Sequence, residues 1–142
     1  MIRKLSKALL FTSLLAASVL TAEEAHYTKA DRIKDMITMA EGMEQIQSGL
    51  LYRCKEGQCI IKGAEDIKSV LVHLEKVDPK DFLDAEQQYA HKFAQKRQLM
   101  LNMYLNEMLE ELKRKDMDAV AHNYGLALRE CTSCHMRLRS NK

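Results

Sequence analysis

The chain of 142 residues contains a single proline, Pro79, and this residue limits the folds that are open to it. Proline removes a backbone donor and disfavours a helical conformation at the preceding residue, so a helix is expected to end near Asp78. Glycine is also scarce, with five residues, and no long stretch alternates apolar and polar side chains with the period of a strand. The sequence therefore predicts an all-α protein that is interrupted near its middle.

Apolar residues recur at helical spacing in four segments, over about 28–49, 64–77, 84–114 and 117–139. The expected inner faces of the first three segments consist of Ile33, Met36, Ala40, Met43 and Leu50, then Ile67, Val70, Leu71, Leu74 and Val77, and then Ala94, Leu101, Leu105, Met108 and Leu112. Asp116 is a suitable N-cap for the fourth segment. Because short connections make neighbouring helices antiparallel, we predict an antiparallel four-helix bundle.

The first 22 residues have the layout of a secretory signal peptide. Basic residues precede an apolar run from Ala8 to Leu20, and Thr21-Ala22 offers a small-residue cleavage point. The run is shorter than the ~20 apolar residues that a bilayer span requires, and a retained N-terminal anchor is the alternative. We expect residues 1–22 to be removed as a signal peptide and residues 23–142 to form one four-helix-bundle domain in the periplasm.

Removal of the leader changes the charge of the protein. The full chain has 22 Lys+Arg and 20 Asp+Glu, and three of the basic residues but none of the acids lie in the leader, so 19 basic and 20 acidic residues remain. The formal charge thus falls from +2 to −1, and no basic excess indicates a nucleic acid partner. The chain also has four cysteines, and thiols of exported proteins are normally paired or bound to another group.

Two of these cysteines belong to the sequence Cys131-Thr132-Ser133-Cys134-His135, near the end of the fourth segment. One stripe of this segment has the spacing 4, 3, 4, 3, 4, 3 and is expected to face the core; it consists of Met117, Ala121, Tyr124, Leu128, Cys131, His135 and Leu138. The opposite face is expected to be solvated; it carries Asp118, His122, Gly125 and Arg129. This pattern aims one imidazole inward with two thiols beside it.

Three kinds of chemistry fit this motif. Covalent haem attachment uses the two thiols of C-x-x-C-H for thioether bonds and the histidine as an axial iron ligand. A thioredoxin-like redox pair expects a βαβ context and a helix N-terminus, whereas this motif ends a helix in an all-α chain. A structural zinc site could use all four cysteines, but such a site would leave His135 without a role. We therefore expect one haem c, bound by Cys131 and Cys134, with His135 on the iron.

The position of the motif on the last helix resembles the class II cytochromes c, the family of cytochrome c′ and its low-spin relatives. The tail CTSCHMRLR is similar to the family ending C-x-x-C-H-x-x-aromatic-Arg, with Leu138 in place of the aromatic residue and Arg139 retained. The stretch RIKDMITMAEGM is similar to the R-x-x-x-M-x-x-M-x-x-x-M first helix of the low-spin members. The resemblance implies a four-helix bundle with the haem on its C-terminal helix.

The same resemblance implies roles for two residues of the first helix. Arg32 would pair with a haem propionate, and Met36 would lie over the distal face of the haem as the candidate sixth ligand. Without the resemblance, Met36, Met39 and Met43 would be read as core packing, since methionine fills irregular gaps well. His26, His73, His91 and His122 occupy no recognisable ligand positions and are expected at the surface or its boundary.

Cys54 and Cys59 depart from the family pattern. No histidine follows Cys59, so the pair is not a second haem motif, and the four residues between the thiols, including Gly57, suit a disulfide-closed loop. A redox-active or metal-binding pair is the alternative. Because of this loop, the surface that related bundles use to form dimers is not carried over to this chain. The sequence does not decide between a monomer and a homodimer.

Two functions differ at one coordination position. If Met36 binds the iron, the haem is six-coordinate and low-spin, and the protein is an electron carrier that works with redox partner proteins. If Met36 only covers the haem, the iron is five-coordinate and can bind nitric oxide or another small gas. We expect electron transfer, because a methionine follows Arg32 by one turn. A haem-free zinc or thiol protein is a third class, and no nucleophile–base pair that would indicate an enzyme is visible.

Overall fold

The computed structural model describes residues 27–52, 54–77 and 88–139. These residues form the helices α1 (Lys29–Tyr52), α2 (Gln58–Leu74), α3 (Gln88–Arg114) and α4 (Met117–Arg139), and a short 3₁₀ helix, η1 (Lys55–Gly57), precedes α2. The prediction of an all-α chain with four helical segments is confirmed. The expected signal peptide (residues 1–22) and the break at Pro79 lie outside the described residues.

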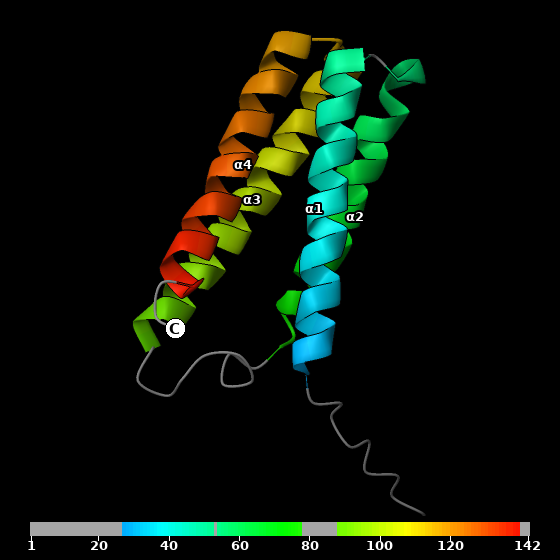
Figure 1. Ribbon diagram of the computed structural model, residues 1–142. Helices are drawn as coiled ribbons and strands as arrows, with labels where there is room; N and C mark the ends of the chain where they lie inside the picture. Colours follow the sequence, from blue (N-terminus) through cyan, green and yellow to red (C-terminus); the bar gives the residue numbers. More distant parts are fainter. Residues whose placement is uncertain (1–26, 53, 78–87, 140–142) are drawn as a thin grey trace, which may run out of the picture.

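The four helices pack as two antiparallel hairpins. One hairpin consists of α1 and α2 and the other of α3 and α4, and the hairpins meet through the neighbouring pairs α2–α3 and α1–α4 (Figure 1). This arrangement is consistent with the predicted antiparallel four-helix bundle. Because α1 and α4 run in opposite directions, the first turns of α1 and the last turns of α4 lie at the same end of the molecule.

Polar caps explain where two of the helices begin. Thr28 Oγ1 accepts a hydrogen bond from the backbone N of Asp31 at 3.2 Å, and Asp31 Oδ2 accepts one from the backbone N of Thr28 at 2.9 Å. This reciprocal pair is a capping box at the start of α1. Before α4, Asp116 Oδ1 accepts a hydrogen bond from the backbone N of Ala119 at 3.0 Å. The predicted N-cap at Asp116 is therefore confirmed.

One core connects both hairpins. Its buried members come from all four helices and are Met43, Ile46, Ile60, Ala64, Ile67, Leu71, Leu101, Tyr104, Leu105, Met108, Val120 and Ala127. Complete burial of a side chain such as Ile46, Ile67 or Leu105 stabilises the fold by about 1.5–3 kcal/mol. The predicted inner face of α3 supplies three of the four core members of that helix, and the predicted face of α2 supplies two of four.

The predicted inner face of α1 is only partly correct. Met43 is buried, but Ile33 and Ala40 are exposed, and the buried positions beside α2 include Gly42, Ile46 and Gly49. The close packing of α1 on α2 selects the stripe with glycines, since these residues let the two backbones approach. The predicted stripe is the adjacent one, on the side of α1 that is turned toward α4.

Candidate functional site

The CTSCH motif occupies the last turns of α4, which remains helical to Arg139. Cys131 and Cys134 are half-buried and form no disulfide. Residues three and four positions apart lie next to each other on a helix, so α4 places Cys134 and His135 beside Cys131. The His135 side chain is also half-buried. The helix thus brings together the three residues that the sequence had grouped.

The buried face of α4 is not the predicted one. Its most buried residues are Val120, Asn123, Ala127 and Glu130, and this stripe faces α3. In the predicted stripe, Leu128 is 42% exposed, Met117 and Ala121 are also exposed, and the other members are half-buried. Each helix of a bundle packs against two neighbouring helices. The helical spacing of the apolar residues does not show which side of α4 faces α3, its partner in the hairpin, and which side faces α1. The face that was expected to be solvated is exposed as predicted.

The predicted stripe of α4 faces α1. Tyr124 Oη, from that stripe, donates a hydrogen bond to Gln47 Oε1 of α1 at 3.4 Å. Since the two helices are antiparallel, eleven residues back from Gln47 and eleven forward from Tyr124 reach Met36 and His135 at the same level of the bundle. Eleven residues are about three helical turns, so both residues also return to the facing sides. Arg32 lies one turn before Met36 on the same side of α1.

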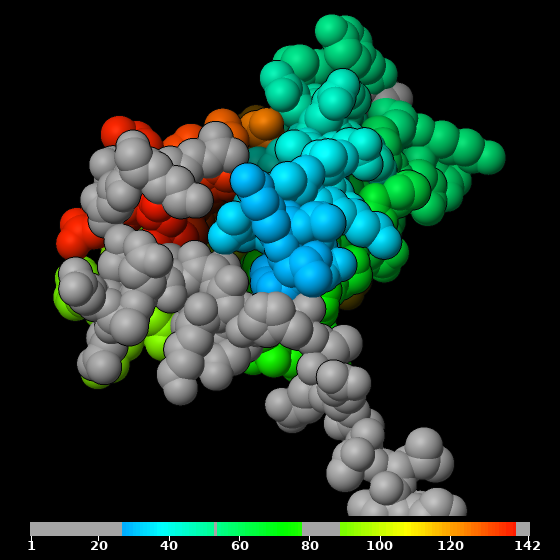
Figure 2. Space-filling view, turned by 60° about the horizontal axis from the view of Figure 1, so that its bottom comes forward, coloured from blue at the N-terminus to red at the C-terminus, as the bar shows by residue number. Residues whose placement is uncertain are grey.

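On α1 and α4 the core ends before this level. The last buried core members toward this end are Met43 on α1 and Ala127 on α4, and Met39 and Cys131 pack at its margin. Closer to the start of α1, the side chains of Ile33 and Ile37 are 50% and 53% exposed. The two hairpins lean apart toward this end in Figure 1, and Figure 2 shows the start of α1 and the end of α4 on the same face of the molecule.

The types of residue at this end of the bundle are those that bind a haem c. A flat apolar macrocycle needs apolar side chains on two facing surfaces, two thiols one turn apart, and a nitrogen donor next to them. The facing stripes of α1 and α4 offer partly exposed apolar side chains, Cys131 and Cys134 supply the thiols, and His135 supplies an imidazole. Met36, on the stripe of α1 that faces α4, is half-buried.

The thiols are in an environment that disfavours their ionised form. Burial raises the pKa of Cys131 to about 11, with a further contribution from the neighbouring Cys134. Burial also raises the pKa of Cys134, although the positive charge of Arg97 acts in the opposite direction. Redox-active and nucleophilic cysteines need a lowered pKa, because the thiolate is the reactive form. The two thiols are therefore poorly suited to thioredoxin-like exchange.

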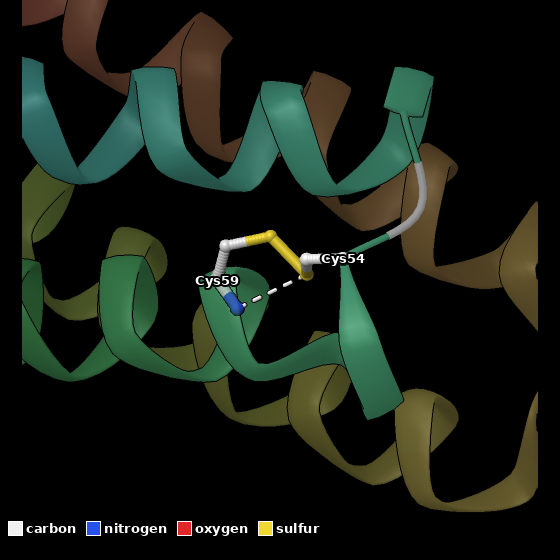
Figure 3. The surroundings of a disulfide bond; sticks show 2 residues. All are labelled: Cys54 and Cys59. Atoms are coloured by element: carbon white, nitrogen blue, oxygen red, sulfur yellow. Dashed lines mark hydrogen bonds between the residues drawn. A yellow bond between two sulfur atoms is a disulfide. The ribbon is translucent and has the colours of Figure 1, made fainter.

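The other two cysteines form a disulfide. Cys54 and Cys59 are bonded across the turn between α1 and α2, and Cys54 Sγ also accepts a hydrogen bond from the backbone N of Cys59 at 3.1 Å (Figure 3). This turn lies at the end of the bundle opposite to the CTSCH motif. The predicted disulfide is confirmed, and a zinc site made by all four cysteines is excluded. Within residues 27–52, 54–77 and 88–139, no three His, Cys, Asp or Glu side chains are grouped to hold a metal ion.

Sequence reasoning missed a buried ion pair beside the motif. Arg97 Nη1 of α3 donates to Glu130 Oε2 of α4 at 2.7 Å, and the Glu130 side chain is 0% exposed. The Arg97 guanidinium also lies 4.7 Å from the centre of the Phe93 ring. One signal was present in the sequence, since Glu130 continues the helical stripe of Val120 and Ala127 and so occupies a core position.

The histidines outside the motif have different surroundings. His73 Nδ1 lies 3.0 Å from Asp35 Oδ2, the same oxygen that accepts a hydrogen bond from Tyr27 Oη at 2.9 Å. His122 is exposed, and His91 is half-buried beside a pocket of about 160 Å³ between the end of α2 and the start of α3. None of these three lies on the α1 or α4 stripes that face each other. His26 lies outside the described residues.

Comparisons with family models, with curated proteins and with solved structures find no match for this chain. None of the helices that the structure describes is long and apolar enough to cross a membrane.

Proposed function

We propose that this chain is a c-type cytochrome that carries one covalent haem c on α4 and transfers single electrons. The supporting observation is the pair of half-buried, unbonded thiols one turn apart, with His135 directly after them. The Tyr124–Gln47 hydrogen bond and the antiparallel directions of α1 and α4 favour a position of Met36 opposite His135. A thiol pair in an oxidising compartment is normally bonded, as Cys54 and Cys59 are. Haem attachment gives Cys131 and Cys134 a different use.

Each residue would have one task. Each thiol of Cys131 and Cys134 would add across a vinyl group, so that sulfur bonds to one vinyl carbon and the thiol hydrogen goes to the other. His135 would donate a nitrogen to the iron, Met36 a sulfur, and Arg32 would hold a propionate by charge. The bound haem supplies a reversible one-electron couple. Ligation by His and Met raises its potential, and the apolar stripes of α1 and α4 would keep water from it.

The proposal includes export to the periplasm. Removal of residues 1–22 would leave residues 23–142 in a compartment where a disulfide such as Cys54–Cys59 persists. The partners would be redox proteins rather than nucleic acid, and the chain would act as a carrier rather than an enzyme. Intact mass of the exported protein tests this part, because it reports both the cleavage site and the added mass of one haem.

The first test of the function is the visible spectrum of the purified protein, oxidised and reduced with dithionite, after expression with a cytochrome c maturation system. A narrow, well-split α/β pair on reduction is expected for a six-coordinate low-spin haem. A broad, unsplit band with a high-spin Soret maximum would instead support the second candidate, a five-coordinate protein that binds nitric oxide. In this alternative, Met36 only packs against the haem and does not bind the iron. A protein without any haem spectrum would refute both.

The ligand role of Met36 is tested separately by Met36→Ala. Loss of the sulfur should convert the low-spin spectrum into a high-spin one while the covalent haem stays attached. Met103→Ala is the matched control, because Met103 is an exposed residue of α3 and its loss should leave the spectrum unchanged. A Met36→Ala protein with the spectrum of the unaltered chain would remove Met36 from the ligand set.

A further inference from the structure

A fully buried carboxylate, that of Glu130, lies one helical turn before the second thiol of the motif, because Glu130 and Cys134 are four residues apart on α4. Glu130 precedes Cys131 in the chain, and its side chain is 0% exposed, whereas that of its partner Arg97 is 24% exposed. The two charged groups meet at 2.7 Å between α3 and α4. This ion pair therefore sits inside the hairpin that carries Cys131 and Cys134, within the low-dielectric part of the protein.

Stability alone is a weak reason for this pair. Glu130 Oε1 and Arg97 Nε are buried and have no hydrogen-bond partner in the described part of the chain. Arg129 Nη2 approaches Glu130 Oε1 only to 3.8 Å, which is too far for a hydrogen bond. A buried pair whose remaining donors and acceptors are unsatisfied does not recover its desolvation cost, and apolar residues of similar size are often at least as stable.

The charges of the pair act on the motif. Glu130 and Cys134 are four residues apart on α4 and so lie one turn apart on the same side of the helix, and the Arg97 guanidinium meets Glu130 at 2.7 Å. The Arg97 guanidinium is kept in place by the Phe93 ring, at 4.7 Å from its centre, and Arg137 of α4 lies 5.5 Å from the centre of the same ring. A group bonded to the two sulfur atoms would experience the electric fields of both charges, and the field of the fully buried Glu130 is the less screened by solvent.

We propose that Glu130 and Arg97 are two opposed buried charges that set the reduction potential of the haem held by Cys131 and Cys134. This inference rests on the proposed function. Oxidised iron carries one more positive charge than reduced iron, so the Glu130 carboxylate favours the oxidised state and the Arg97 guanidinium favours the reduced state. Charge and burial near the group are among the means by which a protein adjusts a haem potential.

The sign of the potential change separates this role from a structural one. In a potentiometric titration, Glu130→Gln should raise the potential and Arg97→Met should lower it, each by about a tenfold change in the equilibrium constant for reduction, or ~59 mV for one electron. The double variant, which has neither charge, should lie between the two single variants. A purely structural disturbance would move both single variants in the same direction or not at all, and either result would overturn the proposal.

Three further variants control for misfolding and for nonspecific charge effects. Arg97→Lys keeps the charge and should keep the potential of the unaltered chain, so the Glu130→Gln and Arg97→Lys proteins decide the question if Arg97→Met does not fold. The control pair is Glu111 and Arg114, which meet at 2.9 Å at the far end of α3. Glu111→Gln and Arg114→Met should leave the potential unchanged, and a shift as large as that of Glu130→Gln would count against the inference.

The experiment distinguishes the failure of this inference from that of the proposed function. If the unaltered chain matures without a covalent haem, the proposed function fails and this inference fails with it. If the haem is attached and the potential of Glu130→Gln is unchanged or lower, only the tuning role fails. The absorption spectrum and the thermal unfolding of each variant are recorded first, so that a changed axial ligand or a loosened hairpin is recognised before potentials are compared.

Discussion

Single residues decide how closely the first two helices approach. A Cβ atom added to Gly42 would lie 2.7 Å from the backbone O of Gly63 and 2.7 Å from Ile67 Cγ1. Gly42→Ala should therefore destabilise the protein by about 1–3 kcal/mol, because buried backbone and a packed side chain must move. Urea unfolding measures the change.

The control for this prediction is another helical glycine. A Cβ atom at Gly125 of α4 would meet no heavy atom within 4 Å in the described structure. Gly125→Ala should therefore stabilise the protein by up to ~1 kcal/mol through helix propensity alone. Equal effects of the two substitutions would show that the space between α1 and α2 is wider than the structure gives.

A second residue-scale prediction concerns alkaline pH. Burial raises the pKa of Tyr27 far above its ordinary value, and the hydrogen bond to Asp35 is the second largest cause. The folded chain thus keeps the phenolic proton at a pH where the unfolded chain, with a pKa of about 10, loses it. The stabilising contribution is complete below pH ~10 and declines as the pH rises further.

The test compares the free energy of unfolding between pH 8 and 11 in the unaltered chain and in Tyr27→Phe. The unaltered chain should lose more stability over this range, because only it has the Tyr27 phenol with its raised pKa. Tyr52 is strongly exposed, so Tyr52→Phe should follow the pH profile of the unaltered chain. Parallel profiles for Tyr27→Phe and the unaltered chain would contradict the assignment.

At the scale of one helix, α4 depends on its N-cap. Asp116 Oδ1 accepts the hydrogen bond from the Ala119 backbone N at 3.0 Å, and Asp116→Ala leaves this donor without a protein partner. A loss of about 1 kcal/mol in the free energy of unfolding is expected. Asp116→Asn retains the side-chain oxygen and should lose much less. A similar loss in both variants would mean that charge rather than the cap hydrogen bond stabilises this end.

The sequence predicted the positions of helices better than their faces. The start of α4 was correct because Asp116 is an unambiguous cap, whereas α2 begins at Gln58, six residues before the predicted start. The apolar pattern did extend back to Ile60, but the residues before it suggested a loop. In the structure, Gly57 has a φ of +72° and turns the chain in so short a space that the helix starts directly after it.

Contacts between distant segments lay beyond the sequence pattern. Arg97 and Glu130 are 33 positions apart, and Tyr124 and Gln47 are 77 apart, so no local period could pair them. Both contacts bear on the candidate site, since one joins the facing stripes of α1 and α4 and the other places a buried charge one turn before Cys134. The motif itself was predictable because all its members lie within five residues of one helix.

At the scale of the whole molecule, the disulfide and the candidate haem site occupy opposite ends of the bundle. The bond joins cysteines five positions apart, and a loop of that length stabilises the folded state by ~2 kcal/mol in the chain-entropy model. Cys54→Ser with Cys59→Ser should therefore lower the unfolding midpoint in urea. If the chain carries the proposed haem, the same double variant should keep its visible spectrum and its reduction potential.

These two outcomes follow from one structural argument. The core between the two ends, from Ile60 and Val120 near the disulfide to Ile67 and Ala127 nearer to Cys131, is fully buried. Loss of the disulfide should therefore change the free energy of unfolding without changing the packing around Cys131. A thiol pair at Cys54 and Cys59 that exchanged electrons with the haem would behave differently. Its removal would alter the rate of haem reduction while stability changed little, and that result would assign the pair a redox role.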